Sequence, residues 1–529
     1  MATIKPSIIP IRGAEQLSSE WRPTEDVVGI EIPMRLEGEI SDVMVRGTIP
    51  DCIDGTFYRT GGDLIIPAKE DHKPFDHNGI VSAFRIKNGR VDFKTRFVQN
   101  DLYKIFKAKR KGLLSGLKEN ELLAHPCVRA VLQQISTVNV MHWGGSLLVL
   151  GEFGPAYTMD PHTLETTGMD PYGAQIGTNT FTAHPHIDPF TDSLIAYSVD
   201  VSGKGQLASY SVSRQGIVSN VHRFPSPIGA MCHDFAMTEN WLIFCVWPTS
   251  LLTDPELGET RLVWKTDIPT RFIVAPRHPD QPLAGSGWRP YESRTYEHPE
   301  NSGFLHTAGA WEVDGKIYFE GTWPHNIHSS VFPFLGSDPK QAFGDTVVDL
   351  ARFMIDPSKP DKSTLEDPEV LVNIPTEFCR IDERYLTRPY ENIFMNVFHS
   401  DPQAPITTSI YYNLNAVAML NKRTKEFKMY YPGPNTRCQE TVFIPRSDDA
   451  PEGDGYIMFS VDRLDVNVTN VVILDTMGDF KTPVAVIELP IRIRCSVHGN
   501  WVDGRELGPT PLVPIPPLHH MNLRLPNGV

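Results

Sequence analysis

Four of the 18 histidines lie in apolar contexts where a solvated side chain would have little reason to be. Imidazole is a good ligand for iron, zinc, copper or nickel, and the residue type alone does not choose among these metals. A single buried histidine is more often a hydrogen-bonded core residue, so the metal hypothesis depends on the four acting together. Each of them follows or ends an apolar segment: His184, His233, His306 and His498.

The four histidines are dozens of residues or more apart along the chain. This spacing excludes a local, finger-like metal site, whose ligands are close in sequence. It is typical of ligands that are supplied by separate structural units and meet only in the folded protein.

Three glutamates, Glu152, Glu377 and Glu440, lie beside apolar, strand-like sequence. A histidine that binds a metal normally donates its other ring N–H to a carboxylate or carbonyl, which orients the ring. Because buried carboxylates need a partner, these acids are candidates for that role. The alternative is that each pairs with a nearby arginine, such as Arg380 or Arg437.

The elements that would carry these residues are short strands separated by turns. Apolar runs such as Ser146–Leu150, Lys316–Glu320 and Ile410–Leu414 alternate with the turn signals Asn88-Gly89, Asp314-Gly315 and Asp454-Gly455. With 45 prolines and 39 glycines, the chain favours an all-β fold of many strands. No sharp repeat is present, but several segments share a loose order of strand, turn and strand. A β-propeller would bury such hairpins radially, with strands from different blades converging on a central axis.

Composition excludes several classes of protein. Hydrophobic residues make up 40% and charged residues 21%, as in globular proteins and unlike disordered ones. The formal net charge of −15 argues against a nucleic-acid partner, which would need a basic surface. No apolar run reaches the roughly 18 residues that a membrane-spanning helix requires.

The seven cysteines are scattered, odd in number and never spaced as C-x-x-C. This usage suits a reducing compartment and excludes a thiolate zinc site. The first residues, Met1 to Arg12, lack the apolar stretch of a secretory signal. We therefore expect a cytoplasmic protein.

One segment, at about residues 100–135, departs from the β pattern. Between residues 102 and 118, basic side chains alternate with apolar ones, which predicts a basic amphipathic helix, although Gly112 and Gly116 weaken it. We interpret it as a helical dome segment inserted in a single domain, 1–529. The alternative is a peripheral membrane contact through residues 102–118 that lifts an apolar substrate from a bilayer.

Several ordered motifs run from Gly47 almost to the C-terminus, and together they resemble the carotenoid cleavage oxygenase family. So many motifs in one order are far more specific than a single short pattern. The segments are Gly47–Arg59, Tyr157–Gly168, Thr182–Pro189, Cys232–Asn240, Ala310–Glu312, Glu440–Pro445 and His498–Trp501.

This resemblance implies a seven-bladed propeller with Fe(II) on its axis under a helical and loop dome. It also implies a reaction that adds O₂ across a conjugated alkene of a small apolar substrate and releases two carbonyl products. By motif match, the implied iron ligands are His184, His233, His306 and His498, and the carboxylates that orient three of them are Glu152, Glu377 and Glu440.

Within the family, Glu312–Tyr318 and Val331–Phe334 look most similar to the branch that cleaves stilbenes and other phenylpropanoid alkenes. Two positions depart from that branch. Stilbene cleavers resemble one another in a lysine that binds a phenol oxygen, and Gly151 occupies that position here. Tyr103 is the nearest candidate for the tyrosine that accompanies this lysine. Val138 stands where a threonine commonly crowds an open iron position, and valine keeps a similar shape without the hydroxyl.

Three functions remain open. The first is an iron(II) dioxygenase acting on an aromatic alkene or an apocarotenoid. The second keeps the metal but isomerises its substrate without oxidation, as one branch of the family does. The third is a catalytically silent propeller that serves as a binding scaffold. A complete set of four histidines and three glutamates favours the enzymes over the scaffold.

Overall fold

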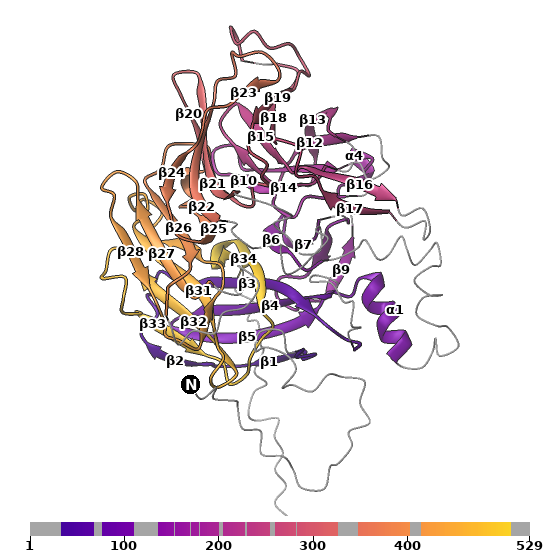
Figure 1. The fold of residues 1–529 in the computed structure, drawn as a ribbon. Helices are drawn as coiled ribbons and strands as arrows, with labels where there is room; N and C mark the ends of the chain where they lie inside the picture. The colour runs from indigo at the N-terminus through magenta and orange to yellow at the C-terminus, as the bar shows by residue number, and fades with distance from the viewer. Residues whose placement is uncertain are drawn as a thin grey trace, which may run out of the picture.

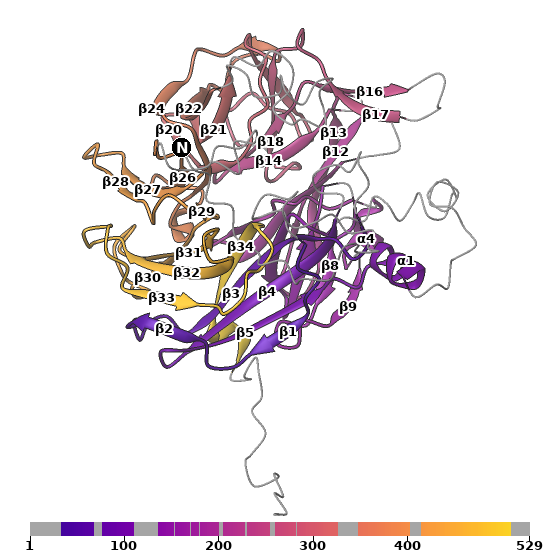
Figure 2. The ribbon, with the colours of Figure 1, turned by 60° about the horizontal axis from the view of Figure 1, so that its bottom comes forward.

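The computed structural model of the 529-residue chain describes residues 33–67, 77–110, 136–152, 154–169, 171–178, 180–199, 205–227, 230–253, 260–281, 283–325, 347–401 and 414–508. These residues form seven sheets of at least four strands, arranged as blades around a common axis (Figures 1 and 2). The prediction of an all-β, seven-bladed propeller is confirmed.

The first three blades are built from the N-terminal part of the chain and one C-terminal strand. Blade one has β34 (Ser496–Asp503), β3 (Gly55–Asp63), β4 (Asn78–Lys87), β5 (Arg90–Phe97) and β1 (Gly38–Ile40). Blade two has β6 (Asn139–Trp143), β7 (Ser146–Leu150), β8 (Tyr157–Met159) and β9 (Thr166–Met169). Blade three has β10 (His186–Asp188), β11 (Ser193–Val199), β12 (Gln206–Val212) and β13 (Val218–Pro225).

The remaining four blades follow in chain order. Blade four has β14 (Cys232–Met237), β15 (Trp241–Val246), β18 (Thr270–Pro276), β19 (Arg294–His298) and β23 (Ser363–Thr364). Blade five has β20 (Thr307–Val313), β21 (Lys316–His325), β22 (Val347–Ile355) and β24 (Glu369–Val372). Blade six has β25 (Thr376–Arg380), β26 (Asn392–Val397), β27 (Ala416–Asn421) and β28 (Phe427–Tyr430). Blade seven has β29 (Thr436–Cys438), β30 (Val442–Pro445), β31 (Gly455–Arg463), β32 (Val468–Asp475), β33 (Ala485–Glu488) and β2 (Met44–Gly47).

Smaller elements decorate the ring. They are the hairpin β16 (Thr249–Thr253) and β17 (Thr260–Trp264), and the helices α1 (Asp101–Arg110), α4 (Gly173–Ile176), η4 (Glu383–Tyr385) and α6 (Gly504–Leu507). Helix α1 lies beside β9 in both views and is the described part of the basic segment at 100–135 (Figures 1 and 2). Residues 111–135 lie outside the described residues, so a dome over the axis and a membrane contact stay predictions. No helix in the described ranges is both long and apolar enough to cross a bilayer.

The core of the molecule lies between neighbouring blades. Every residue of β15, Trp241–Val246, is buried, because a blade is covered by another sheet on each face. Val81 and Ala83 of blade one, for example, pack in one cluster with Leu147 and Val149 of blade two. Since apolar side chains fill these interfaces, the axis is left to the polar ends of the inner strands.

The predicted turns are largely those observed. Asn88 and Gly89 both have positive φ, as do Asp314 and Gly315, so each pair forms the tight turn that joins two antiparallel strands. Gly455, predicted within a turn, instead begins β31, and the positive φ belongs to Gly453. The predicted strand Ile410–Leu414 lies almost wholly outside the described residues.

The two ends of the described chain close the ring. C-terminal β34 pairs with β3 in blade one, while N-terminal β2 pairs with β33 in blade seven (Figure 2). Both ends are therefore needed to complete the blades that meet at the closure, which explains why a residue as late as His498 can share the axis with the others.

The close approach of β34 to β3 gives a stability prediction. A Cβ at Gly499 would lie 2.3 Å from the carbonyl oxygen of Tyr58, so Gly499→Ala is expected to destabilise the protein by about 1–3 kcal/mol because the backbones must separate. Chemical unfolding measures this change. Gly478→Ala is the control, since its Cβ would meet only an ordinary contact at 3.4 Å. Equal stability of the two variants would contradict the tight closure.

Candidate metal centre

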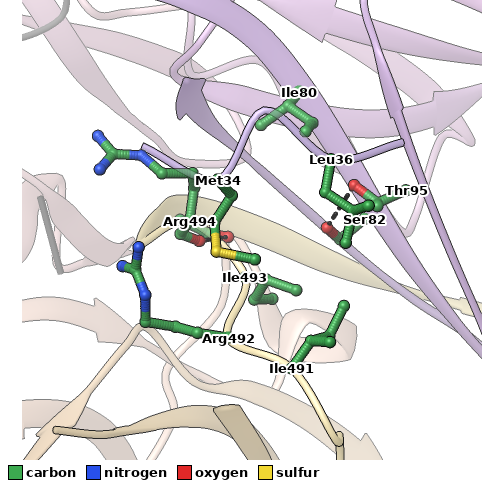
Figure 3. A pocket seen from close by; sticks show the side chains of 10 residues that line it. Met34, Leu36, Ile80, Ser82, Thr95, Ile491, Arg492, Ile493 and Arg494 are labelled. Atoms are coloured by element: carbon green, nitrogen blue, oxygen red, sulfur yellow. Dashed lines mark hydrogen bonds between the residues drawn. The ribbon is translucent and has the colours of Figure 1, made fainter. Parts of the chain in front are cut away.

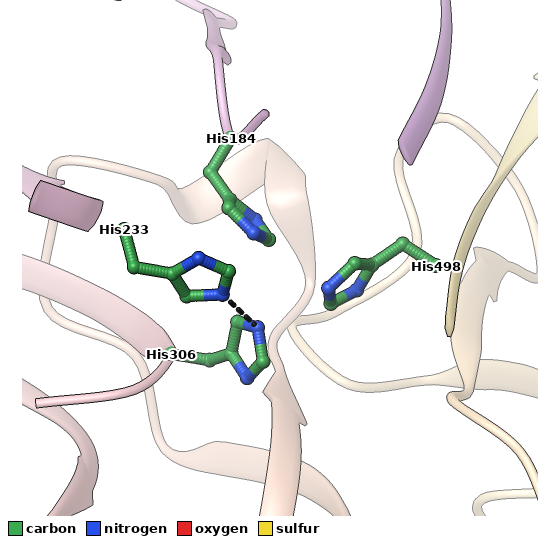
Figure 4. A group of neighbouring side chains, drawn as sticks. All are labelled: His184, His233, His306 and His498. Atoms are coloured by element: carbon green, nitrogen blue, oxygen red, sulfur yellow. Dashed lines mark hydrogen bonds between the residues drawn. The ribbon is translucent and has the colours of Figure 1, made fainter. Parts of the chain in front are cut away.

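The four predicted histidines converge on the axis from four blades (Figure 4). One potential ligand atom from each lies within 4.8 Å of all the others, and all four residues are buried. His233 is on β14 and His498 on β34, whereas His306 immediately precedes β20 and His184 lies two residues before β10. Residues far apart in sequence are neighbours here because the inner strands of all blades meet on the axis.

Irregular strand pairing directs these side chains. The register shifts at Cys232–Phe235 of β14, Thr307–Gly309 of β20 and Glu377–Arg380 of β25. A bulge inserts one extra residue and re-aims the side chains beside it. The inner ends of these strands therefore turn toward the axis instead of continuing the regular alternation.

Glu377 and Glu440 hold two of the histidines. The Nδ1 atom of His306 lies 2.5 Å from Glu377 Oε2, and that of His498 lies 3.0 Å from Glu440 Oε1. A carboxylate only accepts, so both Nδ1 atoms carry the proton and both Nε2 atoms keep a lone pair. Both acids therefore lie next to the histidines.

Glu152 approaches the third histidine. Its Oε1 lies 2.7 Å from His233 Nδ1 as an ion-pair contact, but off the direction in which that N–H points. The two groups are therefore in contact without forming a hydrogen bond. Thus each of the three acids faces a different histidine, and His184 is the histidine for which no such acid was predicted.

The surroundings of the imidazoles keep two of them neutral and favour the charged form of a third. Burial and the neighbouring histidines hold the pKa of His184 and of His498 well below the ordinary value. Burial also lowers the pKa of His306, but the charge and hydrogen bond of Glu377, with Asp234 and Glu440, outweigh it, and the pKa is raised. Neutral imidazole is the form that binds a metal.

The donor atoms fit a metal ion. The Nε2 atoms of His233 and His306 lie 3.0 Å apart, at hydrogen-bond distance (Figure 4). When both rings are neutral and Nδ1 of His306 donates to Glu377, a cation between the two Nε2 atoms would take the place of the proton they share. The Nε2 atoms of His184 and His498 are buried with no hydrogen-bond partner among the described residues. A buried polar atom left unpaired costs about 1–3 kcal/mol, which a shared metal would offset.

Several contacts were not predicted from the sequence. The hydroxyl of Thr322 donates to Glu377 at 2.5 Å. Asp234, adjacent to His233, accepts hydrogen bonds from the backbone N–H and hydroxyl of Thr307, next to His306. Burial raises the pKa of Asp234, but its contact with His186 and the nearby imidazoles lower it further, so it is charged. The only sequence feature that pointed to Asp234 was its position next to His233, a candidate ligand.

Phe378 packs against two of the histidines. Its ring is stacked 5.3 Å from that of His306 and lies edge-on 5.4 Å from that of His498. Its φ of 55° is in the left-handed region, which a bulky residue rarely adopts. The bulge of β25 imposes this conformation, and nothing in the amino-acid type announces it.

Two arginines also reach the centre. Arg380 Nη1 lies 3.3 Å from Glu440 Oε1, and Arg59 Nη1 lies 3.5 Å from Glu440 Oε2. The alternative that an acid pairs with Arg380 is therefore correct for Glu440, in addition to its contact with His498. Arg59 belongs to the Gly47–Arg59 motif, and its role was not recognised there.

Of the predicted substrate pocket, Val138 and Gly151 lie at the start of β6 and the end of β7, and Tyr103 lies on α1. Val138 donates its N–H to the carbonyl of Leu150, which places it beside Gly151 and next to Glu152. Tyr103 packs with Phe97, and its hydroxyl accepts a hydrogen bond from Lys107 at 3.2 Å. Val331–Phe334 lies outside the described residues.

The fold and the cluster define a class of protein: a seven-bladed propeller whose axis can hold a metal through buried imidazoles. The family model described as retinal pigment epithelial membrane protein matches residues 32–503. The chain therefore belongs to this family, the carotenoid cleavage oxygenases, whose members are non-haem iron enzymes.

Individual relatives agree with this assignment. The chain is 40% identical to resveratrol cleavage oxygenase 1 of Botryotinia fuckeliana over 94% of this chain and 88% of the relative. It is 32% identical to isoeugenol monooxygenase of Pseudomonas nitroreducens, over 91% and 98%. The solved lignostilbene dioxygenase of Pseudomonas brassicacearum superposes with a TM-score of 0.79 at 31% identity, covering 92% of this chain and 99% of that one.

The chain is an alkene-cleaving dioxygenase of this family, as its motifs predicted. The relatives do not favour non-oxidative isomerisation or a silent scaffold.

Proposed function

We propose that this enzyme uses iron(II), held by His184, His233, His306 and His498, to cleave a conjugated carbon–carbon double bond with O₂. The observation that carries the proposal is the convergence of four buried imidazole nitrogens on one point of the axis. Imidazole binds iron as well as zinc or copper, and membership of an iron-dependent family favours iron among them.

The charges around the histidines support a divalent ion. Three carboxylates contact the rings, Asp234 lies next to His233, and the two arginines both contact Glu440, so negative side chains outnumber positive ones around the rings. Four neutral imidazoles do not compensate the positive charge of the ion, so the acids around these rings balance it. The acids are Glu152, Glu377, Glu440 and Asp234.

The protein contributes position and electrostatics. When bound, iron supplies the activation of O₂ for its addition across the alkene. Glu152, Glu377 and Glu440 orient three rings, so that their Nε2 lone pairs face the ion. Phe378 covers two of the rings with an apolar surface, which excludes water from that side.

The first test is metal content and oxygen incorporation. We expect purified protein to hold about one iron per chain, and its two carbonyl products to carry ¹⁸O when the reaction is run in ¹⁸O₂. Elemental analysis and mass spectrometry measure both. Products of unchanged oxidation state would instead show an isomerase, and a protein without bound metal would contradict the metal site.

We propose an aromatic alkene of the stilbene or phenylpropene type as the substrate, with an apocarotenoid as the second candidate. The names of the relatives from Botryotinia and Pseudomonas refer to resveratrol, isoeugenol and lignostilbene, which supports the aromatic alkene. Gly151 beside Glu152 lacks the ammonium group that would grip a phenol oxygen, and it leaves more space for the ring.

This arrangement predicts a weak dependence on the 4-hydroxyl group. A charge-assisted hydrogen bond contributes about 1.5–3 kcal/mol, so its absence should leave kcat/KM similar for stilbenes with and without that hydroxyl. Gly151→Lys is expected to raise the preference for the hydroxylated substrate. Steady-state kinetics on the matched pair measures this. A strong preference in the unaltered enzyme would mean that another residue grips the phenol.

We further propose a cytoplasmic location. The six cysteines in the described part of the chain are free thiols, which supports a reducing compartment.

A further inference from the structure

Glu377 and Glu440, two of the carboxylates that face the histidines, differ in the groups that contact them. Besides His306, Glu377 accepts hydrogen bonds from the hydroxyl of Thr322 and the backbone N–H of Phe378, both uncharged donors. Glu440 accepts from the backbone N–H of Gly499 but also contacts two guanidinium groups. The negative charge of Glu440 is therefore shared with cations, and that of Glu377 is not shared with any cation whose contact the described residues show.

The two guanidiniums at Glu440 differ in access to solvent. The side chain of Arg59 is fully buried, and it also reaches the main-chain carbonyls of Glu440 and Ser496, so it is part of the blade closure. The side chain of Arg380 is 18% exposed. Its Nη2 donates to Glu383 and, at 2.8 Å, to Asn500, while its Nη1 faces Glu440.

Arg380 lines a large cavity that is partly open to solvent, which we call the Arg380 cavity. It has a volume of about 900 Å³ and is bounded by η4, β30, the end of β34 and the β4 residues Arg85 and Lys87. A second cavity, beside Arg492 and Arg494, measures only about 10 Å³, which is at most the space of one water molecule (Figure 3). Solvent in the Arg380 cavity is thus one side chain away from Glu440, and Glu440 is one hydrogen bond away from His498.

The bulge of β25 places Glu377 and Arg380 on the same side of the strand. Residues at odd separations on a regular strand point to opposite faces. Glu377 and Arg380, three apart, pair with Asn396 and Phe394, which are two apart and share a face of β26. One extra residue therefore sends both Glu377 and Arg380 toward the axis, where Glu377 contacts His306 and Arg380 contacts Glu440.

We propose that Arg380 is a positioning residue that draws the charge of Glu440 away from His498, so that His498 donates less electron density to the metal than His306 does. A carboxylate that accepts the N–H of a ligand histidine raises the basicity of that ligand. A cation on the same oxygen opposes this effect, because Oε1 of Glu440 faces both His498 and Arg380. The inference rests on the proposed iron site.

The test compares iron binding among variants of the full-length enzyme. Arg380→Gln removes the charge, and Arg380→Lys retains it. Arg505→Gln is the control, because Arg505 lines the same cavity with a 70% exposed side chain and pairs with Asp448 and Asp503 instead of Glu440. The readouts are the rate of Fe(II) loss to a chelator under anaerobic conditions and the midpoint potential of the bound iron.

The direction in which the rate of iron loss changes separates a charge effect of Arg380 from a structural one. Arg380→Gln should lose iron more slowly, by up to roughly tenfold, and lower the midpoint potential, because Glu440 then acts on His498 without opposition. Arg380→Lys and Arg505→Gln should stay close to the unaltered enzyme. If Arg380 merely braced Glu440, Arg380→Gln would lose iron faster, which would overturn the proposal.

A double-mutant cycle shows whether the effect passes through Glu440. In a Glu440→Gln background, replacing Arg380 by Gln should change iron loss much less, since the two residues act in series. An effect of full size in that background would assign it to direct repulsion of the ion and overturn the positioning role. Unaltered enzyme that holds no iron would contradict the metal site itself, whereas equal binding by all variants would contradict only the role of Arg380.

Discussion

Replacing His306 by alanine is expected to abolish stoichiometric iron binding and alkene cleavage. The substitution removes one donor nitrogen and leaves Glu377, which is fully buried, without the N–H it accepts at 2.5 Å. A coordinate bond lost from the centre affects metal binding directly, whereas a histidine lost from an ordinary core mainly lowers stability. Iron per chain and product formation measure the result, and the same outcome is expected for alanine at His184, His233 and His498.

His222→Ala is a matched control. His222 is as buried as the four candidates, but it lies on β13 and contacts the carbonyl of Tyr291 at 3.0 Å, away from the axis. This variant should unfold more easily and still hold about one iron per chain. Full iron content in any of the four cluster variants would remove that histidine from the set of ligands.

Replacing Glu377 by glutamine is expected to lower iron affinity or turnover by about 10–100-fold. The shape of the side chain is kept, but the charge that raises the basicity of His306 is lost. The new amide also brings an NH₂ group into a site where Thr322, Phe378 and His306 all donate. Metal competition and kcat measure the effect. Glu152→Gln and Glu440→Gln should act in the same direction.

Glu320→Gln separates this effect from the general cost of altering a buried acid. Glu320 is also fully buried, but it pairs with Arg352 and Lys422 and accepts the hydroxyl of Tyr390, outside the metal centre. Its replacement should reduce the free energy of unfolding and leave iron affinity unchanged. Normal iron affinity and turnover in Glu377→Gln would show that Glu377 is an ordinary buried partner.

The fold class and the inventory of the centre could be predicted from the sequence because both depend on local patterns. Turn pairs such as Asn88-Gly89 require positive φ, which side-chain chemistry announces, and apolar runs such as Trp241–Val246 mark strands covered on both faces. The histidines and glutamates stood out because a polar side chain in an apolar segment requires a partner when it is buried. The resemblance to a family added the number of blades and the choice of iron.

Which side chains meet, and how, was decided only by the tertiary structure. The pairing of β3 with β34, from opposite ends of the chain, brings Arg59 to Glu440, and no local pattern encodes so distant a contact. Bulges place Glu377 and Arg380 on one face and hold Phe378 at positive φ against two imidazoles, although regular alternation predicts the opposite. Residue types therefore determined that the protein could bind a metal. The packing of blades around an axis decided the charge that surrounds each ligand, because electrostatic effects depend on distances that the sequence does not contain.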